Sequence, residues 1–180
     1  MQRAQSRTLQ VEQIGEEVMI KNILLPVDGS RTSMRAAREG IELAKALGAQ
    51  VTVLTVTTPW TAYFSRELAA VVPDVVIPQI EYDLKREATA ALILNNIVTD
   101  ARLLEVRAKS VHRSEAHPYD AIVKTAEHEG CDLIVMGSYK DVAFTGMLLG
   151  SETMKVIAHS TIPVLVHRDG ARAHGRSACD

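Results

Sequence analysis

The sequence contains few cysteines and no long apolar run, and both absences limit the kind of protein it encodes. Among 180 residues there are two cysteines, Cys131 and Cys179, and they form no CxxC pair. Isolated thiols favour a reducing compartment, so we expect a cytoplasmic protein. No apolar stretch approaches the ~18 residues that a membrane-spanning helix needs. Residues 1–20 also lack the apolar segment of a secretory signal, so we expect neither membrane association nor secretion.

Several motifs of catalytic and nucleotide-binding proteins are also missing. The sequence has no G-x-x-x-x-G-K-[ST] motif, which excludes a P-loop NTPase. No G-x-G-x-x-G motif follows the first predicted strand, which argues against a dinucleotide-binding domain. There is no G-x-S-x-G elbow and no evident general base, so we expect no dedicated enzyme and at most slow hydrolysis of a nucleotide. His112 and His117 flank one predicted loop without a third ligand, so no metal site is predicted there.

The charge balance excludes a further class of function. The formal net charge is -2 at pH 7. This balance predicts no general affinity for nucleic acid or for anionic membranes. Apolar residues make up 47% of the chain, which is enough for one globular domain with a substantial core.

The folded part of the chain is predicted to span residues 19–168. Residues 1–18 and 169–180 are polar and show no periodicity, so we expect a flexible N-terminal extension and a flexible C-terminal tail. Between them, apolar and β-branched runs alternate with segments of helical periodicity, and an irregular segment with room for a short helix follows the second run. The predicted strands cover residues 20–28, 50–58, 104–111, 132–137 and 162–168, and the predicted helices cover 30–48, 82–103, 118–129 and 151–160.

Local signals predict the ends and faces of these helices. Ser30 and Ser151 are suited to cap the first and last helices, and Gly48 is suited to end the first. The apolar pattern of the helix at 82–103 predicts which of its faces lies against the sheet. That pattern runs through Leu84, Ala88, Ala91, Asn95 and Val98.

The alternation of strands and helices predicts how the strands assemble. Near-continuous apolar strands separated by helices are typical of a parallel sheet that is buried on both faces. In such sheets, ligands bind beyond the carboxyl ends of the strands, where the strand order reverses. We therefore expect the site in the segments that follow three of the strands. These are VDGS at 27–30, VTTP at 56–59 and MGSYK at 136–140.

The segment CDLIVMGSYKDVAFTGMLLGSE, residues 131–152, carries the most informative pattern of glycines. Gly137 ends a predicted strand, and Gly150 precedes Ser151 at a predicted helix start. A helix N-terminus offers unpaired N–H groups and a partial positive charge, which suit a phosphate. The same residues are also typical of a strand end, a turn and an ordinary helix cap. The residues alone leave both interpretations open.

The folded part of the chain resembles the universal stress protein family. The resemblance rests on NILLPVDGS with Asp28, on DLIVMGS, on a later LLGS and on a closing IPVLV. ATP-binding members of that family carry Gly-x-x-Gly, then nine residues, then Gly-Ser or Gly-Thr. This sequence has Gly137 and Lys140 in the first part and, nine residues later, Gly150 and Ser151. The resemblance implies an α/β, Rossmann-like three-layer sandwich of the adenine nucleotide alpha hydrolase-like type, with a five-stranded parallel sheet of order 3-2-1-4-5.

The resemblance also implies roles for individual residues. Asp28 would lie near the ribose or near a magnesium ion that enters with the nucleotide. Alternatively, Asp28 forms an Asx turn or caps the following helix. The resemblance implies that Pro26, Val27 and Val56 contact the base, that Met136 and Gly137 contact the ribose, and that Gly150, Ser151 and Thr153 contact the phosphates.

Two residues depart from the pattern of the ATP-binding members. Lys140 stands at the second glycine position, where a left-handed backbone would cost a lysine about 1 kcal/mol or more and its β-carbon would crowd a phosphate chain. A lysine at this place can also pair with a phosphate, or simply lie exposed in solvent. Glu152 follows the Gly-Ser pair, where an apolar residue is usual; it complements the helix dipole but repels a triphosphate. AMP or ADP is affected less than ATP by both departures.

The resemblance leaves two functions of different kinds in view. One is a regulator of the stress response that binds ATP or AMP. The alternative is a family member without nucleotide that acts as a homodimeric protein-interaction module with a protein partner. The resemblance implies a homodimer through the last strand, Pro163 to His167, whose apolar edge invites pairing. An enzyme of the nucleotide-alpha-hydrolase type would need a catalytic pair, which the sequence does not show.

Overall fold

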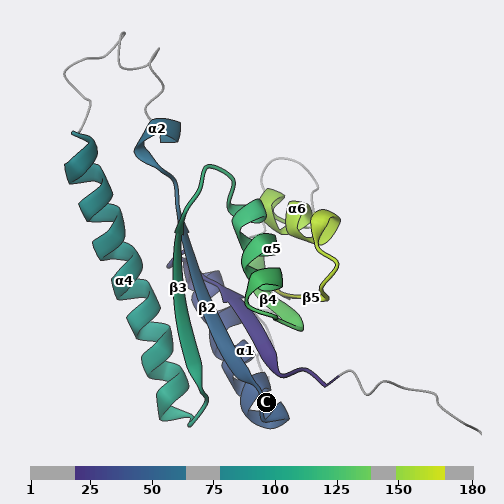
Figure 1. Ribbon diagram of the computed structural model, residues 1–180. Helices are drawn as coiled ribbons and strands as arrows, with labels where there is room; N and C mark the ends of the chain where they lie inside the picture. Colours follow the sequence, from purple (N-terminus) through teal and green to yellow (C-terminus); the bar gives the residue numbers. More distant parts are fainter. Residues whose placement is uncertain (1–18, 64–77, 139–148, 169–180) are drawn as a thin grey trace, which may run out of the picture.

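The structure, a computed structural model, describes residues 19–63, 78–138 and 149–168. In these residues, helices cover both faces of one central sheet, as Figure 1 shows. The predictions for the two terminal segments and for Lys140 concern positions outside the described residues. None of the described helices has both the length and the apolar composition of a membrane span.

A five-stranded parallel sheet organises the fold. Its strand order is β3-β2-β1-β4-β5, and all neighbouring strands run parallel. The predicted fold class and strand order are therefore confirmed. The strands are β1 (Asn22–Pro26), β2 (Gln50–Thr57), β3 (Ala108–Ser114), β4 (Leu133–Ser138) and β5 (Val164–Arg168), and the helices are α1 (Arg31–Leu47), α2 (Trp60–Tyr63), α4 (Gln79–Leu103), α5 (Pro118–His128) and α6 (Ser151–His159).

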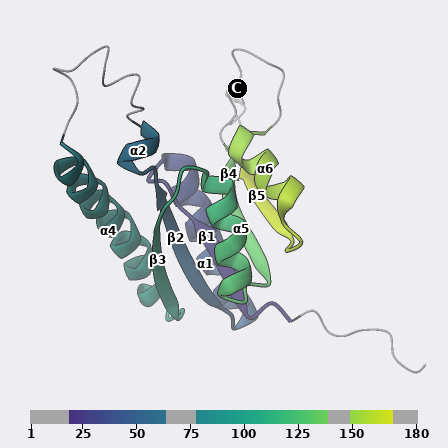
Figure 2. The same cartoon turned by 45° about the horizontal axis from the view of Figure 1, so that its top comes forward.

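Two apolar cores lie on opposite faces of the sheet. Because successive side chains of a strand point to opposite faces, Ile23 and Leu25 of β1 enter one core while Leu24 enters the other. Ile41 of α1 and Ile97 of α4 close the first core. Residues of α5 and α6 close the second core, and Figure 2 shows these two helices next to each other on one face of the sheet, where α5 contacts β2 and α6 contacts β4 and β5. Burying a large aliphatic side chain contributes about 1.5–3 kcal/mol, so these two cores hold the layers together.

The first and last helices begin in different ways. The hydroxyl of Ser30 accepts a hydrogen bond of 3.2 Å from the backbone N–H of Ser33, which confirms the predicted cap of α1. The predicted cap of α6 is wrong, because Gly150 occupies the cap position and Ser151 is the first helical residue. Since glycine has no side chain, no side chain caps the N-terminus of α6 from that position.

The third strand begins later than predicted. It runs from Ala108 to Ser114, whereas the alternating pattern predicted a strand over 104–111. Glu105 adopts a positive φ of 61°, which belongs to a turn rather than to a strand. Leu104 and Val106 nevertheless contact the first core, and this explains why the segment has an alternating apolar pattern.

The buried face of α4 also differs from the predicted one. The helix begins at Gln79, three residues earlier than predicted, and Leu84 of the predicted face is 61% exposed. Apolar residues occur on two sides of this helix, so their spacing alone did not indicate which side faces the sheet. The side chains buried against the sheet are those of Tyr82, Ala90, Leu94, Ile97 and Ala101.

Candidate functional site

A cavity of about 340 Å³ lies at the carboxyl ends of β1, β2 and β4. From β1 the chain continues outward to β2 and β3 and then returns to β4 on the other side of β1, so the strand order reverses at this point. Every predicted site residue that the structure describes lines this cavity, whereas Lys140 lies outside the described residues. These lining residues are Pro26, Val27, Asp28, Val56, Met136, Gly137, Gly150, Ser151 and Thr153.

One side of the cavity is apolar. Leu54 and Val56 of β2 lie two residues apart and therefore point to the same face, where Met136 of β4 and Ile122 of α5 join them. Leu54 and Ile122 were not among the predicted site residues. The period of two along β2 would have indicated Leu54, whereas Ile122 needs the packing of α5 on the sheet to be known. Three further lining residues were not predicted to contact a ligand, namely Ser33, Pro118 and Glu152.

Asp28 lines the cavity, and hydrogen bonds from the start of α1 hold its side chain. Its Oδ1 accepts hydrogen bonds from the backbone N–H of Ser30 at 2.9 Å and from the hydroxyl of Ser33 at 2.5 Å. The first of these bonds is the Asx turn that was one of the two interpretations of this residue. Burial raises the pKa of Asp28, but the hydrogen bonds from Ser33 and Ser30 outweigh it, so the pKa lies below its ordinary value. The carboxyl group is therefore ionised at neutral pH.

Gly137 is constrained by close packing between β4 and α1. A β-carbon at this position would lie 2.7 Å from the carbonyl oxygen of Thr32 and 3.0 Å from the nitrogen of Ser33. Both are backbone atoms, which cannot rotate away as a side chain can. A glycine is therefore needed here for the fold itself, at a position that also lines the cavity.

The N-terminus of α6 opens into the cavity. The hydroxyl of Ser138, at the end of β4, accepts a hydrogen bond of 2.8 Å from the N–H of Gly150 and so fixes the start of the helix. The first N–H groups of a helix, here those of Ser151, Glu152 and Thr153, have no partner within the helix. Together with the helix dipole they create a partial positive charge, which suits an anion.

Glu152 links α6 to α5 at the same place. Its Oε2 accepts a hydrogen bond of 3.0 Å from the backbone N–H of Tyr119, near the start of α5. His117, the cap residue of α5, makes no side-chain cap, so Glu152 satisfies a donor of that helix. Its Oε1 pairs with Lys155 at 2.8 Å, and this contact raises the pKa of Lys155. The negative charge of Glu152 thus faces the cavity, but two donors hold it.

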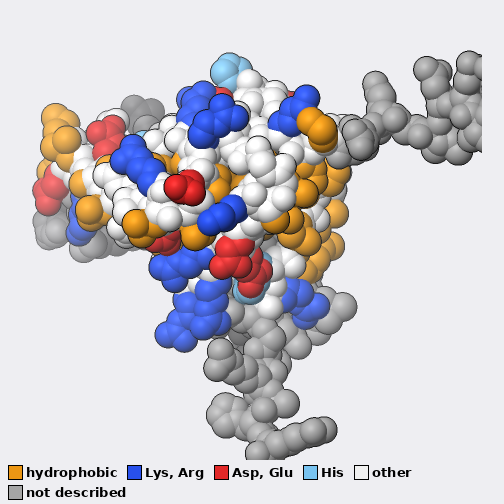
Figure 3. Space-filling model, turned by 90° about the horizontal axis from the view of Figure 1, so that it is seen from below, with side chains coloured by type: hydrophobic (Ala, Val, Ile, Leu, Met, Phe, Trp, Pro, Cys, Tyr) orange, Lys and Arg blue, Asp and Glu red, His pale blue; other side chains and the backbone are white. Residues whose placement is uncertain are grey.

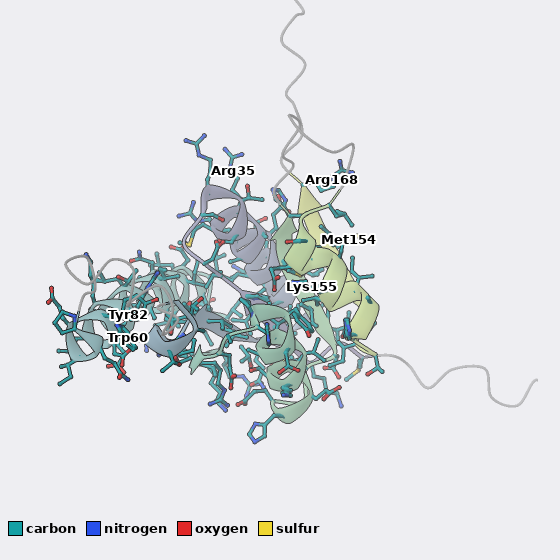
Figure 4. All side chains as sticks on the ribbon, turned by 90° about the horizontal axis from the view of Figure 1, so that it is seen from above. Arg35, Trp60, Tyr82, Met154, Lys155 and Arg168 are labelled. Atoms are coloured by element: carbon teal, nitrogen blue, oxygen red, sulfur yellow. The ribbon has the colours of Figure 1, made fainter. Side chains whose placement is uncertain are left out.

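A second cavity of about 340 Å³ lies between β2, β3 and α4. Trp60 lines this second cavity rather than the first. Figure 4 looks onto the same end of the sheet and shows Trp60 and Tyr82 together, away from Lys155 on α6. His112 also lines the second cavity, where its Nε2 contacts the Thr57 hydroxyl at 2.9 Å. Among the residues that the structure describes, no three histidine, cysteine or acidic side chains are arranged to hold a metal ion.

Comparison with known proteins identifies sequences and structures similar to this chain. Residues 19–168 match the profile described as the Universal stress protein family. The universal stress protein YxiE of Bacillus subtilis is 32% identical over 151 residues, which cover 83% of this chain and 100% of that protein. The solved structure of protein MJ0577 of Methanocaldococcus jannaschii is 31% identical, with a TM-score of 0.64 over 84% of this chain and 98% of that chain.

A further solved structure has the same fold at lower identity. It is a universal stress protein in complex with cAMP, with 22% identity and a TM-score of 0.61. The alignment covers 84% of this chain and 99% of that chain.

Proposed function

Because the chain belongs to the universal stress protein family, we propose that its first cavity binds an adenine nucleotide and that the protein is a cytoplasmic regulator of the stress response. One observation carries the proposal: a single cavity joins an apolar wall to the uncapped N-terminus of a helix. A nucleotide has the same division between an apolar ring and an anionic end. The cAMP complex of a protein with the same fold supports this class of ligand.

The apolar wall suits the base. Small-molecule sites are mostly lined by apolar side chains, with a few polar groups that fix the orientation of the ligand. Leu54, Val56, Ile122 and Met136 provide such a surface from three different elements. In the proposed complex the adenine ring lies against these four side chains.

The N-terminus of α6 suits the phosphate. The N–H groups of Ser151, Glu152 and Thr153 lack partners within the helix, and the Ser151 side chain adds a hydroxyl at the cavity. Thr153 is 3% exposed, so its own position is fixed by packing. These groups would hold one phosphate by hydrogen bonds and by the helix dipole.

Two carboxylates favour a short phosphate chain. Asp28 and Glu152 both line the cavity, and each repels additional phosphate charge. Asp28, ionised at neutral pH, would accept a hydrogen bond from the ribose or hold a magnesium ion that accompanies a longer phosphate chain. We therefore propose that AMP binds at least as tightly as ATP without magnesium, and that magnesium favours ATP.

Calorimetric titration of the nucleotide-free protein with AMP, ADP and ATP, with and without magnesium, tests the proposal. The variant Ser151→Asp places a negative charge at the proposed phosphate position, while an acid in a first helical turn keeps α6 stable. Gln79→Asp is the matched control, because it adds the same charge to the exposed first turn of α4. We expect Ser151→Asp to weaken AMP binding about tenfold or more and Gln79→Asp to leave it unchanged. Absence of binding by the unmodified protein, or equal binding by both variants, contradicts the proposal.

A second candidate function is supported by the exposed apolar residues of β5 and α6. Leu165, on the edge strand β5, is 49% exposed, and Met154 and Ile157 of α6 are 50% and 43% exposed. Figure 4 shows Met154 close to Arg168 at the end of β5. We propose that the β5 edge forms a homodimer. Such a dimer fits either function, a protein-interaction module or a nucleotide-binding regulator.

Sedimentation velocity tests the β5 homodimer. We expect Leu165→Lys to weaken it, because the substitution places charge on the edge strand. Leu47→Lys is the matched control, since Leu47 is equally exposed at 48% but lies at the end of α1. A monomeric unmodified protein at micromolar concentration would overturn this proposal and would leave the nucleotide proposal unaffected.

A further inference from the structure

α4 has a second apolar face that the described fold does not cover. Ile80, Leu84 and Leu92 are 76%, 61% and 67% exposed, and Ala88 and Ala91 are also exposed. Figure 3 shows hydrophobic side chains at the surface on the α4 side of the molecule, at the left of the view. Contiguous apolar surface of this kind is typical of an interaction site.

The spacing on this face is that of a helix-pairing surface. Leu84, Ala88, Ala91 and Asn95 are exposed and are separated by four, three and four residues, which is the heptad spacing of a coiled-coil seam. Val98 comes next in this spacing but packs against the first core, so it is not part of the uncovered face. We call Leu84, Ala88, Ala91 and Asn95 the outer stripe. The two alanines at its centre allow another helix to approach closely.

Charges at the two ends of the outer stripe are complementary. Glu81 lies near its N-terminal end and Arg102 near its C-terminal end, and both are exposed. Neither residue forms an ion pair with the residues that the structure describes. The two are a whole number of heptads apart, so they lie on nearly the same side of the helix. An antiparallel copy would bring Glu81 of one chain within about one turn of Arg102 of the other, twice by symmetry.

We propose that the outer stripe docks against the outer stripe of a second copy of this chain, antiparallel and related by a two-fold axis near Ala91. A parallel arrangement would instead place Glu81 beside Glu81 and Arg102 beside Arg102. α4 covers the β2 and β3 side of the sheet, whereas β5 is its opposite edge, as Figure 1 shows. The α4 contact and the β5 contact therefore use different surfaces and can form together.

The contact is tested by sedimentation velocity in a Leu165→Lys background, which removes the proposed β5 contact. In this background we expect a dimer at micromolar to submillimolar concentration. Ala91→Glu should raise its dissociation constant about tenfold or more, because it buries an unpaired charge at the two-fold axis. Ala46→Glu, an exposed alanine of α1, is the matched control and should have no effect. Circular dichroism verifies that each variant is folded.

Charge exchange tests the orientation. Glu81→Arg should weaken the dimer about threefold to tenfold, and the double variant Glu81→Arg with Arg102→Glu should restore it. In a parallel dimer neither change would show this pattern of loss and rescue. If the Leu165→Lys protein is monomeric at submillimolar concentration, the proposal is overturned. The outer stripe would then have to bind a different partner rather than a second copy of this chain. A dimer that Ala91→Glu does not weaken overturns it as well.

Discussion

The side chain of Glu152 on α6 accepts a hydrogen bond of 3.0 Å from the backbone N–H of Tyr119 on α5. Glu152 thereby satisfies a backbone N–H donor at the N-terminus of α5, while Glu152 itself lies in the first turn of α6. Both helix starts line the cavity that we propose for the nucleotide, through Pro118 and Ser151. Glu152 therefore couples the packing of two helices to the charge of the proposed phosphate site.

Replacing Glu152 separates these two effects. In Glu152→Gln the amide oxygen can still accept from Tyr119, but the negative charge at the cavity is gone. We expect ATP to gain affinity relative to AMP, by about threefold to tenfold, because a longer phosphate chain meets more of the repulsion. Calorimetric titration with both nucleotides measures the ratio. Glu42→Gln, on the exposed surface of α1, is the control, and an ATP to AMP ratio unchanged in Glu152→Gln would contradict the explanation.

Asp28 should contribute to the acid dependence of stability. Its pKa is lowered in the folded protein, so its contribution is present above the unfolded pKa of about 3.9 and is lost as pH falls through the folded pKa. Urea unfolding between neutral pH and pH of about 3 should show a smaller loss of stability in Asp28→Asn than in the unmodified protein. Asp83→Asn, on α4, is the control. An identical acid profile in Asp28→Asn and the unmodified protein would refute the assignment.

Cys131 should be unreactive in the folded protein. Burial raises the pKa of its thiol to about 11, and the residue is 5% exposed. In a Cys179→Ser background, alkylation at pH of about 8 should be slow and should become fast only when urea unfolds the chain. Because the folded pKa is raised, the contribution of the thiol to stability is complete below the unfolded pKa of about 8.5 and is lost as pH rises through about 11. Rapid labelling without urea, as fast as at an added Ala46→Cys, would show that the thiol is accessible.

Gly137→Ala should destabilise the fold and weaken nucleotide binding together. The added β-carbon meets the Thr32 carbonyl oxygen at 2.7 Å, and the shift that relieves this contact costs about 1–3 kcal/mol. Gly130→Ala is the control, because its φ of 61° disfavours alanine by about 1 kcal/mol while its β-carbon would meet no atom within 4 Å. Denaturant unfolding and AMP titration of both variants check this. Normal AMP affinity in Gly137→Ala would show that this contact does not shape the cavity.

The strands of the sheet were predictable because a local pattern in the sequence marks each of them. Each strand is a short apolar or β-branched run, and the helices between them leave parallel pairing as the solution. The resemblance on Asp28, Gly137 and Gly150 then supplied the strand order that the structure confirms. The residues that the resemblance placed at a ligand do gather around one cavity, and their contact with a nucleotide stays a prediction.

The features that were not predicted depend on tertiary packing. Periodicity found an apolar stripe through Leu84 on α4, but the helix has apolar residues on two sides, and packing against the sheet uses the side of Leu94. The turn at Glu105 places the flanking apolar residues in the core without a strand. The cap that Glu152 provides for α5 joins residues of two helices, and no local pattern indicates it.

Nuclear magnetic resonance titration of the labelled protein with AMP tests the central proposal most directly, because it reports where the ligand binds. We expect the backbone N–H signals of Ser151 and Thr153 and the methyl signals of Val56 and Ile122 to shift together with increasing AMP. The Trp60 indole signal, from the second cavity, should stay in place. Shifts confined to the second cavity, or no shifts at millimolar AMP, would contradict nucleotide binding at the carboxyl ends of β1 and β4.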